Sequence, residues 1–182
     1  MHGSAGALEA RARHLRDFSR AFETAGQGMR SLSTGAWQGE AADAFRQKFD
    51  MHPKQWLTAA DACEAAAEAL EAYADTVRWA QGQAQAAIDA YRDAQETSRR
   101  AVDAHNARVT AYNQAADRYN AALAAGEDPG ARPTEPGAFT DPGEAGRREA
   151  EEILAEARRQ RTDVARDAAR RVAAAAETAP PT

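Results

Sequence analysis

Cysteine is almost absent from this chain of 182 residues: Cys63 stands alone, so no disulfide can form within it. Aromatic residues make up only 7% of the sequence, while hydrophobic residues make up 43%, much of it alanine. Because few bulky side chains are available to exclude water, the composition predicts a thin, elongated helical core in place of a thick globular one.

The sequence also lacks a surplus of basic over acidic residues, and it lacks long apolar runs. The formal net charge is −5, which gives no general attraction for nucleic acid. No run of about 18 apolar residues is present, so we expect no stable membrane insertion. The first residues, "MHGSAGALEARARHL", lack the basic, apolar and cleavage segments of a Sec signal peptide.

Apolar side chains recur at heptad spacing from residue 8 to residue 32, which predicts a first helix with one packing seam. Helix propensity falls in the following "SLSTG" stretch. Gly26 and Gly28 weaken the last turns and permit close approach of another backbone. The seam residues are Leu8, Leu15, Phe22 and Met29 in one row, with Phe18, Ala25 and Leu32 in the other.

A second helical pattern restarts after Gly39 and meets Pro53, where a kink or short break is expected. Beyond it, two heptad rows continue to residue 123 and predict a helix of roughly 100 Å at ~1.5 Å per residue. One row is Trp56, Cys63, Leu70, Val77, Ala84, Tyr91, Ser98, His105, Tyr112 and Tyr119. The other is Ala60, Ala67, Ala74, Gln81, Ile88, Gln95, Val102, Val109, Ala116 and Leu123.

The remaining chain divides at a Pro/Gly-rich loop, predicted over residues 126–143. A third helix, predicted over 144–176, folds back on the rod, and residues 177–182 read as the start of a linker. The hairpin with its extended second helix takes residues 6–125, and residues 1–5 are set apart as a candidate cloning remnant. The predicted fold is all-α, an elongated antiparallel hairpin or coiled coil.

Residues that could support catalysis do not converge in the sequence. The four histidines show no paired metal-ligand spacing. Cys63 lies on the seam, which favours a packed thiol over a nucleophile. Glu64, Glu68 and Glu71 are expected on a solvated helix face. We therefore expect no enzyme activity, catalytic residue, metal site or cofactor.

The turn "GAWQGEAADAFRQKF", set between the first heptad helix and "WLTAADACEAAAEALEAYADTVRWAQ", resembles the WXG superfamily. These proteins are helical-hairpin substrates of type VII (Esx-type) secretion systems in Gram-positive bacteria and actinobacteria. The resemblance covers residue 8 to about residue 80 and looks closest to the N-terminal targeting domains of actinobacterial polymorphic toxins.

The resemblance implies that Trp37 and Gly39 form an export-recognition turn; the alternative is that Trp37 only packs the open end of the hairpin. The core of the hairpin is expected to consist of Leu15, Phe18, Phe22, Met29, Leu32, Phe45, Phe49 and Trp56. The family's second signal, Tyr-x-x-x-Asp or Tyr-x-x-x-Glu, is absent. Either a partner chain supplies its acidic half or this chain uses a different signal.

An antiparallel first helix is expected to cover the second only to around Ala66. Leu70, Tyr73, Val77 and Trp79 are therefore a candidate interface for a second hairpin, from a homodimer or a small WXG-like helical partner.

The leading hypothesis is a non-catalytic domain that folds in the cytoplasm and is recognised by the type VII secretion machinery. It would direct the export of a downstream toxin domain in the same chain. The alternative is a structural coiled-coil scaffold or spacer with no export role.

Overall fold

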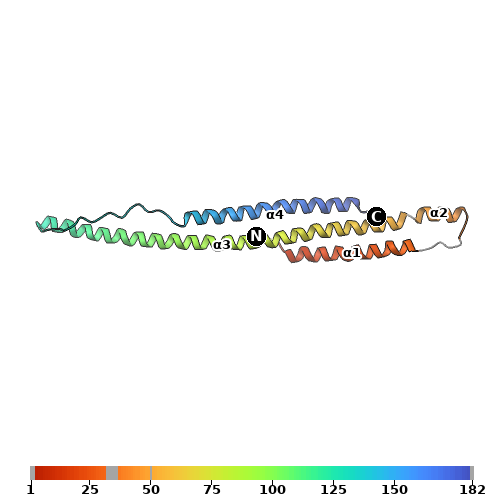
Figure 1. Ribbon diagram of the computed structural model, residues 1–182, viewed down its shortest axis with the longest axis horizontal. Coiled ribbons are helices and arrows are strands. Elements are labelled where there is room, and N and C mark those ends of the chain that lie inside the picture. Colours follow the sequence, from red (N-terminus) through yellow and green to blue (C-terminus); the bar gives the residue numbers. More distant parts are fainter. Residues whose placement is uncertain (1–2, 32–36, 50, 181–182) are drawn as a thin grey trace. The chain divides into compact units, whose positions relative to one another are not determined.

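The computed structural model describes residues 3–31, 37–49 and 51–180. It contains four helices: α1 (Ala5–Ser31), α2 (Glu40–Phe49), α3 (Met51–Ala125) and α4 (Glu144–Thr178) (Figure 1). No strand occurs among these described residues. The predicted all-α hairpin with a very long helix and a final helix that folds back is confirmed.

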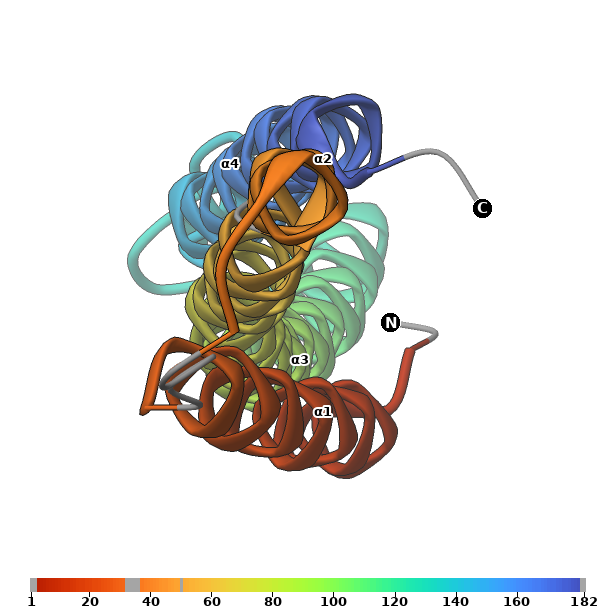
Figure 2. The ribbon, with the colours of Figure 1, turned by 90° about the vertical axis from the view of Figure 1, so that its right-hand side faces the viewer.

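The chain divides into two compact units, and α3 and α4 each contribute to both. The first unit comprises Met1–Gly82 and Glu156–Thr182, and the second comprises Gln83–Ala155. In the first unit, α3 lies between α1 and the end of α4, as the view along the helices shows (Figure 2). Each unit is therefore a small helical bundle that uses a different stretch of α3.

Small residues form the buried line of α1. Ala5, Ala12, Ser19 and Gly26 follow one another at heptad spacing and are the buried residues of this helix. The predicted period is thus present, but the centre of the seam is different: the row predicted from Leu8 to Met29 lies beside it and is half-buried. Small side chains at the centre let two helix backbones approach closely, and the larger neighbours then flank the contact.

The first helix, α1, contacts a longer stretch of α3 than the helix length read from the sequence predicted. A Cβ atom at Gly26 would lie 3.1 Å from the backbone oxygen of Pro53. At the other end of α1, Gln81 donates a side-chain hydrogen bond of 2.9 Å to the carbonyl oxygen of Gly3. The pairing therefore starts at Pro53 rather than at the turn, and α1 covers α3 well beyond Ala66.

Pro53 lies in the first turn of α3, where backbone amides have no partner within the helix. It is buried, which fits its contact with Gly26. α2 ends at Phe49 and α3 begins at Met51, so the helix boundary falls close to the break predicted around Pro53.

In the second unit, residues 126–143 form a strap along α3. Phe139 contacts His105, with ring centroids 5.4 Å apart, and Tyr112 donates a hydrogen bond of 3.3 Å to Glu135. Ser98 donates to Asp141 at 2.5 Å. Between residues 98 and 112 the helix advances about 20 Å, and an extended chain from 135 to 141 advances about the same distance. The strap is therefore an extended segment that runs antiparallel to α3.

Asp141 joins the strap, α3 and the start of α4. Its carboxylate accepts hydrogen bonds from Ser98, from the amide of Gly143 at 2.9 Å and from Arg147 at 2.6 Å. These donors lower the pKa of Asp141 to about 2, with the Ser98 hydroxyl as the largest cause, followed by Arg147. A Cβ atom at Gly143 would lie 2.1 Å from the carbonyl oxygen of Ala94, so only glycine fits this contact.

Candidate functional site: the hairpin tip

Three aromatic side chains gather at the tip of the hairpin, and we call Trp37, Phe45 and Phe49 the tip aromatics. The ring centroids of Trp37 and Phe45 are 5.4 Å apart, and those of Phe45 and Phe49 are 5.2 Å apart. Trp37 is 48% exposed and Phe45 is 43% exposed. An apolar surface of this kind at the end of a helix pair is suited to contact with another protein.

Gly39 sets the direction in which the chain enters α2. Its φ of +106° belongs to a region that residues with a side chain rarely adopt. Its carbonyl oxygen accepts hydrogen bonds from the amides of Ala42 at 2.9 Å and Asp43 at 3.0 Å. No atom lies within 4 Å of the position a Cβ would take. Backbone conformation, rather than lack of space, therefore requires glycine here.

Arg46 ties Trp37 to the first turns of α2. Its guanidinium donates to the carbonyl oxygen of Trp37 and, at 2.7 Å, to the carboxylate of Asp43. The Trp37 backbone is thus held by a charged hydrogen bond, while its indole rests on Phe45.

A second aromatic row has a packing role. Phe18 and Phe22 of α1 are stacked with centroids 6.0 Å apart, and Phe22 contacts Trp56 of α3 at 5.3 Å. Phe22 and Trp56 are half-buried, whereas Phe18 is 45% exposed. This row joins α1 to α3, which distinguishes Trp56 from the exposed Trp37.

The other residues predicted for the hairpin core differ in how far they are buried. Leu15 packs beside the buried cluster formed by Ala62 and Ala66, and Met29 is half-buried. Leu32 lies outside the described residues.

The surface predicted as a partner interface is mostly occupied by the chain itself. Val77 is 1% exposed and packs with Ala5 of α1 and with Tyr73, which is half-buried, as is Leu70. Trp79 is 40% exposed. The reason is the register of α1, which reaches this part of α3.

The acidic row of α3 stays partly solvated, with side chains 37–58% exposed, and it also pairs with arginines of the neighbouring helices. Arg16 of α1 donates to Glu64 at 2.9 Å and to Glu71 at 2.7 Å. A carboxylate oxygen of Glu68 lies 3.6 Å from a guanidinium nitrogen of Arg171 of α4. The two carboxylates that bond Arg16 raise the pKa of its guanidinium, with Glu71 as the larger cause. These ion pairs therefore connect α3 to both α1 and α4.

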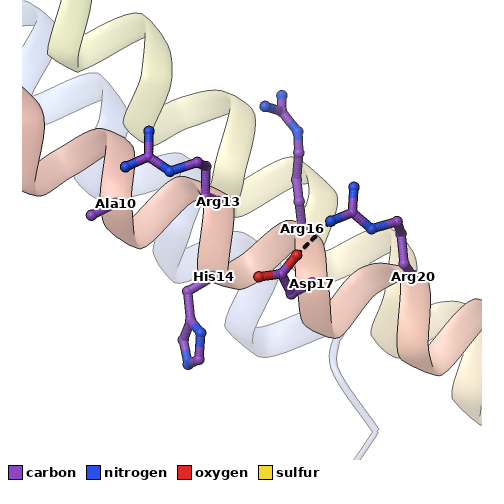
Figure 3. A pocket seen from close by; sticks show the side chains of 6 residues that line it. All are labelled: Ala10, Arg13, His14, Arg16, Asp17 and Arg20. Atoms are coloured by element: carbon purple, nitrogen blue, oxygen red, sulfur yellow. Dashed lines mark hydrogen bonds and ion pairs between the residues drawn. The ribbon is translucent and has the colours of Figure 1, made fainter.

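A shallow hollow on α1 lies beside this ion pair (Figure 3). Within it, Arg20 bonds to Asp17 on the same helix, while Arg16 extends toward α3. The hollow is lined by Ala10, Arg13, His14, Arg16, Asp17 and Arg20.

Cys63 is half-buried, and this burial raises the pKa of its thiol. No group of three or more His, Cys, Asp or Glu residues that could hold a metal ion occurs in the described ranges. In those same ranges no helix is both long and apolar enough to cross a membrane.

Comparison with protein families matches residues 1–182 to the family described as "Putative T7SS secretion signal domain". Since the match spans the whole chain, the chain belongs to this family of type VII secretion signal domains. Searches of curated proteins and of solved structures gave no match. The family supports a role in targeting for type VII export and an interaction with the secretion machinery.

Proposed function

We propose that this chain is the non-catalytic targeting domain of a type VII-secreted effector toxin, and that the secretion machinery recognises it through the hairpin tip. The observation that carries the proposal is the exposed pair Trp37 and Phe45 at the tip of a chain that belongs to a secretion signal family. The domain folds before export and presents this tip as a rigid surface.

Three features of the tip support recognition there. The aromatic rings are exposed, the Trp37 backbone is held by Arg46, and Gly39 gives the chain a conformation that few other residues adopt. A preorganised surface binds a partner with less loss of conformational entropy than a mobile loop does. Trp37 therefore contributes to binding rather than to the packing of α1 on α3.

The toxin assignment rests on the resemblance of the hairpin to the N-terminal domains of polymorphic toxins. In this proposal the cargo is a toxin domain in the same polypeptide, and the domain accompanies it out of the cell. No tyrosine in the sequence is followed four residues later by Asp or Glu. In this proposal either a partner chain supplies the acidic half of the family signal or this chain uses a different signal.

The test is export of a reporter fused to residues 1–182 from a host with the cognate type VII system. Trp37→Ala should abolish export while circular dichroism shows unchanged helix content. Trp79→Ala is the matched control, because Trp79 is a similarly exposed tryptophan in the same unit and lies on α3 rather than at the tip.

Each outcome separates the targeting role from a scaffold role. Export lost with Trp37→Ala and kept with Trp79→Ala supports recognition at the tip. Export that survives Trp37→Ala refutes it. Loss of thermal stability by Trp37→Ala without a change in secretion favours the structural scaffold.

A further inference from the structure

The last turns of α4 pack on α3 within the first unit. Ala175 is 7% exposed, so its side chain is enclosed by the helix that it meets. A guanidinium nitrogen of Arg171 lies 3.6 Å from a carboxylate oxygen of Glu68, one turn earlier on α4. The end of α4 is therefore fixed to α3 by an apolar contact and a charged one. The apolar cluster consists of Ala62, Ala66 and Ala175, with Val172 and Ala179 packed against it.

The order of these contacts shows which way α4 runs along α3 in this unit. Arg171 meets Glu68. Four residues later, Ala175 packs in the cluster with Ala62. Each step forward along α4 is thus a step back along α3, toward Pro53 and the tip end of the hairpin. From Ala62 to Pro53 the helix advances only about 14 Å.

The end of α4 has a fixed conformation. The hydroxyl of Thr178 donates a hydrogen bond of 2.9 Å to the carbonyl oxygen of Ala175, and the amide of Ala179 donates to the same oxygen at 3.2 Å. Pro180 follows, and a proline has no amide hydrogen with which to continue the helix. The chain therefore leaves α4 at one defined place, beside the N-terminal part of α3.

The earlier elements would leave the chain elsewhere. Helix α3 ends at Ala125, which belongs to the second unit. The strap and the first part of α4 belong to that unit as well. It is the last part of α4, from Glu156, that returns the chain to the unit of the tip aromatics.

We propose that α4 is a return element, which places the chain that follows the domain beside the hairpin tip, and that Ala175 is the contact that holds it there. This inference rests on the proposed function, because it assigns a position to the cargo. In this arrangement, a component of the secretion machinery that binds the tip aromatics meets the beginning of the cargo at the same end of the first unit.

The short separation has a physical advantage. A partner that already holds the tip makes its next contact, with the beginning of the cargo, as an intramolecular step. The effective concentration for such a step is high when the two sites are a short distance apart, and it falls when one of them is on a long flexible tether. A detached end of α4 would therefore weaken the second contact without changing the first.

The first measurement is the position of the α4 end in the full chain. Spin labels at Gln55→Cys and Glu177→Cys, in a chain that also carries Cys63→Ser, report this distance by double electron–electron resonance. We expect one narrow distance distribution. Ala175→Asp places a carboxylate in the buried cluster, so it should broaden the distribution and shift it to longer distances.

Ala173→Asp is the matched control, because Ala173 is exposed and lies two residues from Ala175 on the same helix. It adds the same charge and should leave the distance distribution unchanged. A broad distribution in the chain without either aspartate would overturn the proposal, and this result does not depend on any variant of α4. An equal response of Ala175→Asp and Ala173→Asp would also overturn it.

The second measurement is export of the reporter fused after Thr182. Ala175→Asp should lose most of its export, and Ala173→Asp should keep it. Full export of Ala175→Asp, with the end of α4 shown to be detached, would overturn the return role and leave recognition at the tip standing. That result differs from export that survives Trp37→Ala, which refutes recognition at the tip itself.

Discussion

Gly26 of α1 and Pro53 of α3 lie so close that a Cβ atom at position 26 would stand 3.1 Å from the Pro53 carbonyl oxygen. The same Cβ would lie 3.0 Å from Cγ of Leu57. Both distances are shorter than ordinary van der Waals contact, so this glycine sets the separation of the two helices at the tip end.

Gly26→Ala should lower the free energy of unfolding by about 1–3 kcal/mol, because overpacking outweighs the gain in helix propensity. Gly28→Ala is the matched control: nothing lies within 4 Å of its Cβ position, so it should stabilise by up to about 1 kcal/mol. Urea unfolding followed by circular dichroism measures both. A stabilising Gly26→Ala would contradict the close approach.

Arg16→Gln should destabilise the first unit, and the loss should shrink as salt is added, because Arg16 joins α1 to two carboxylates of α3. Its matched control is Arg20→Gln, since Arg20 pairs within its own helix with Asp17. A double-mutant cycle should show larger coupling for Arg16 with Glu71 than for Arg20 with Asp17. Equal coupling energies would mean that the ion pair between α1 and α3 contributes no more than the pair within α1.

Asp141 makes the stability of the second unit depend on acid. Its pKa is lowered to about 2 in the folded chain, from an ordinary value of 3.8. The ionised Asp141 carboxylate therefore contributes fully to the stability of the second unit above about pH 4. This contribution is lost as the pH falls from about 4 to about 2. Asp141→Asn should flatten stability over this window, as measured by amide exchange of the first turn of α4.

Asp128→Asn is the control for that measurement. Asp128 accepts a hydrogen bond of 3.0 Å from the amide of Gly130, similar to the Asp141–Gly143 contact, in the same strap. Acid dependence in the second unit should be unchanged by this variant, and a flattening equal to that of Asp141→Asn would point to general charge effects.

Gly39→Ala should cost about 1–2 kcal/mol locally, because alanine is strained at a φ of +106°. The cost should appear as faster amide exchange at Ala42 and Asp43, whose amides bond to Gly39. Gly82→Ala, at a helical glycine with open space around it, should not show this effect. Unchanged exchange in Gly39→Ala would show that the tip does not need this conformation.

The local elements were largely predictable from the residues. Heptad spacing indicated the helices, four of the seven prolines marked the segment around the strap, and the Trp37–Gly39 turn indicated a secretion-related hairpin. These signals are local, because helix propensity, proline geometry and turn chemistry act over a few residues.

The network around Asp141 could not be found in this way. Ser98 was visible only as a polar residue in a heptad row, and Asp141 only as a residue before a proline. A helix-start pattern of Asp, Pro and then Glu144 was available as a signal for the beginning of α4. Nothing in it indicated which turn of α3 would receive Asp141.

The sequence by itself determined that the chain is helical, where the strap lies and which residue forms the turn. Only the tertiary structure decided which face of α1 is buried and that Glu64 and Glu71 bond Arg16. Heptad spacing defines a row of contacts but not its partner or register. Those depend on how closely small residues such as Gly26 let two backbones approach, which is a property of the packed pair.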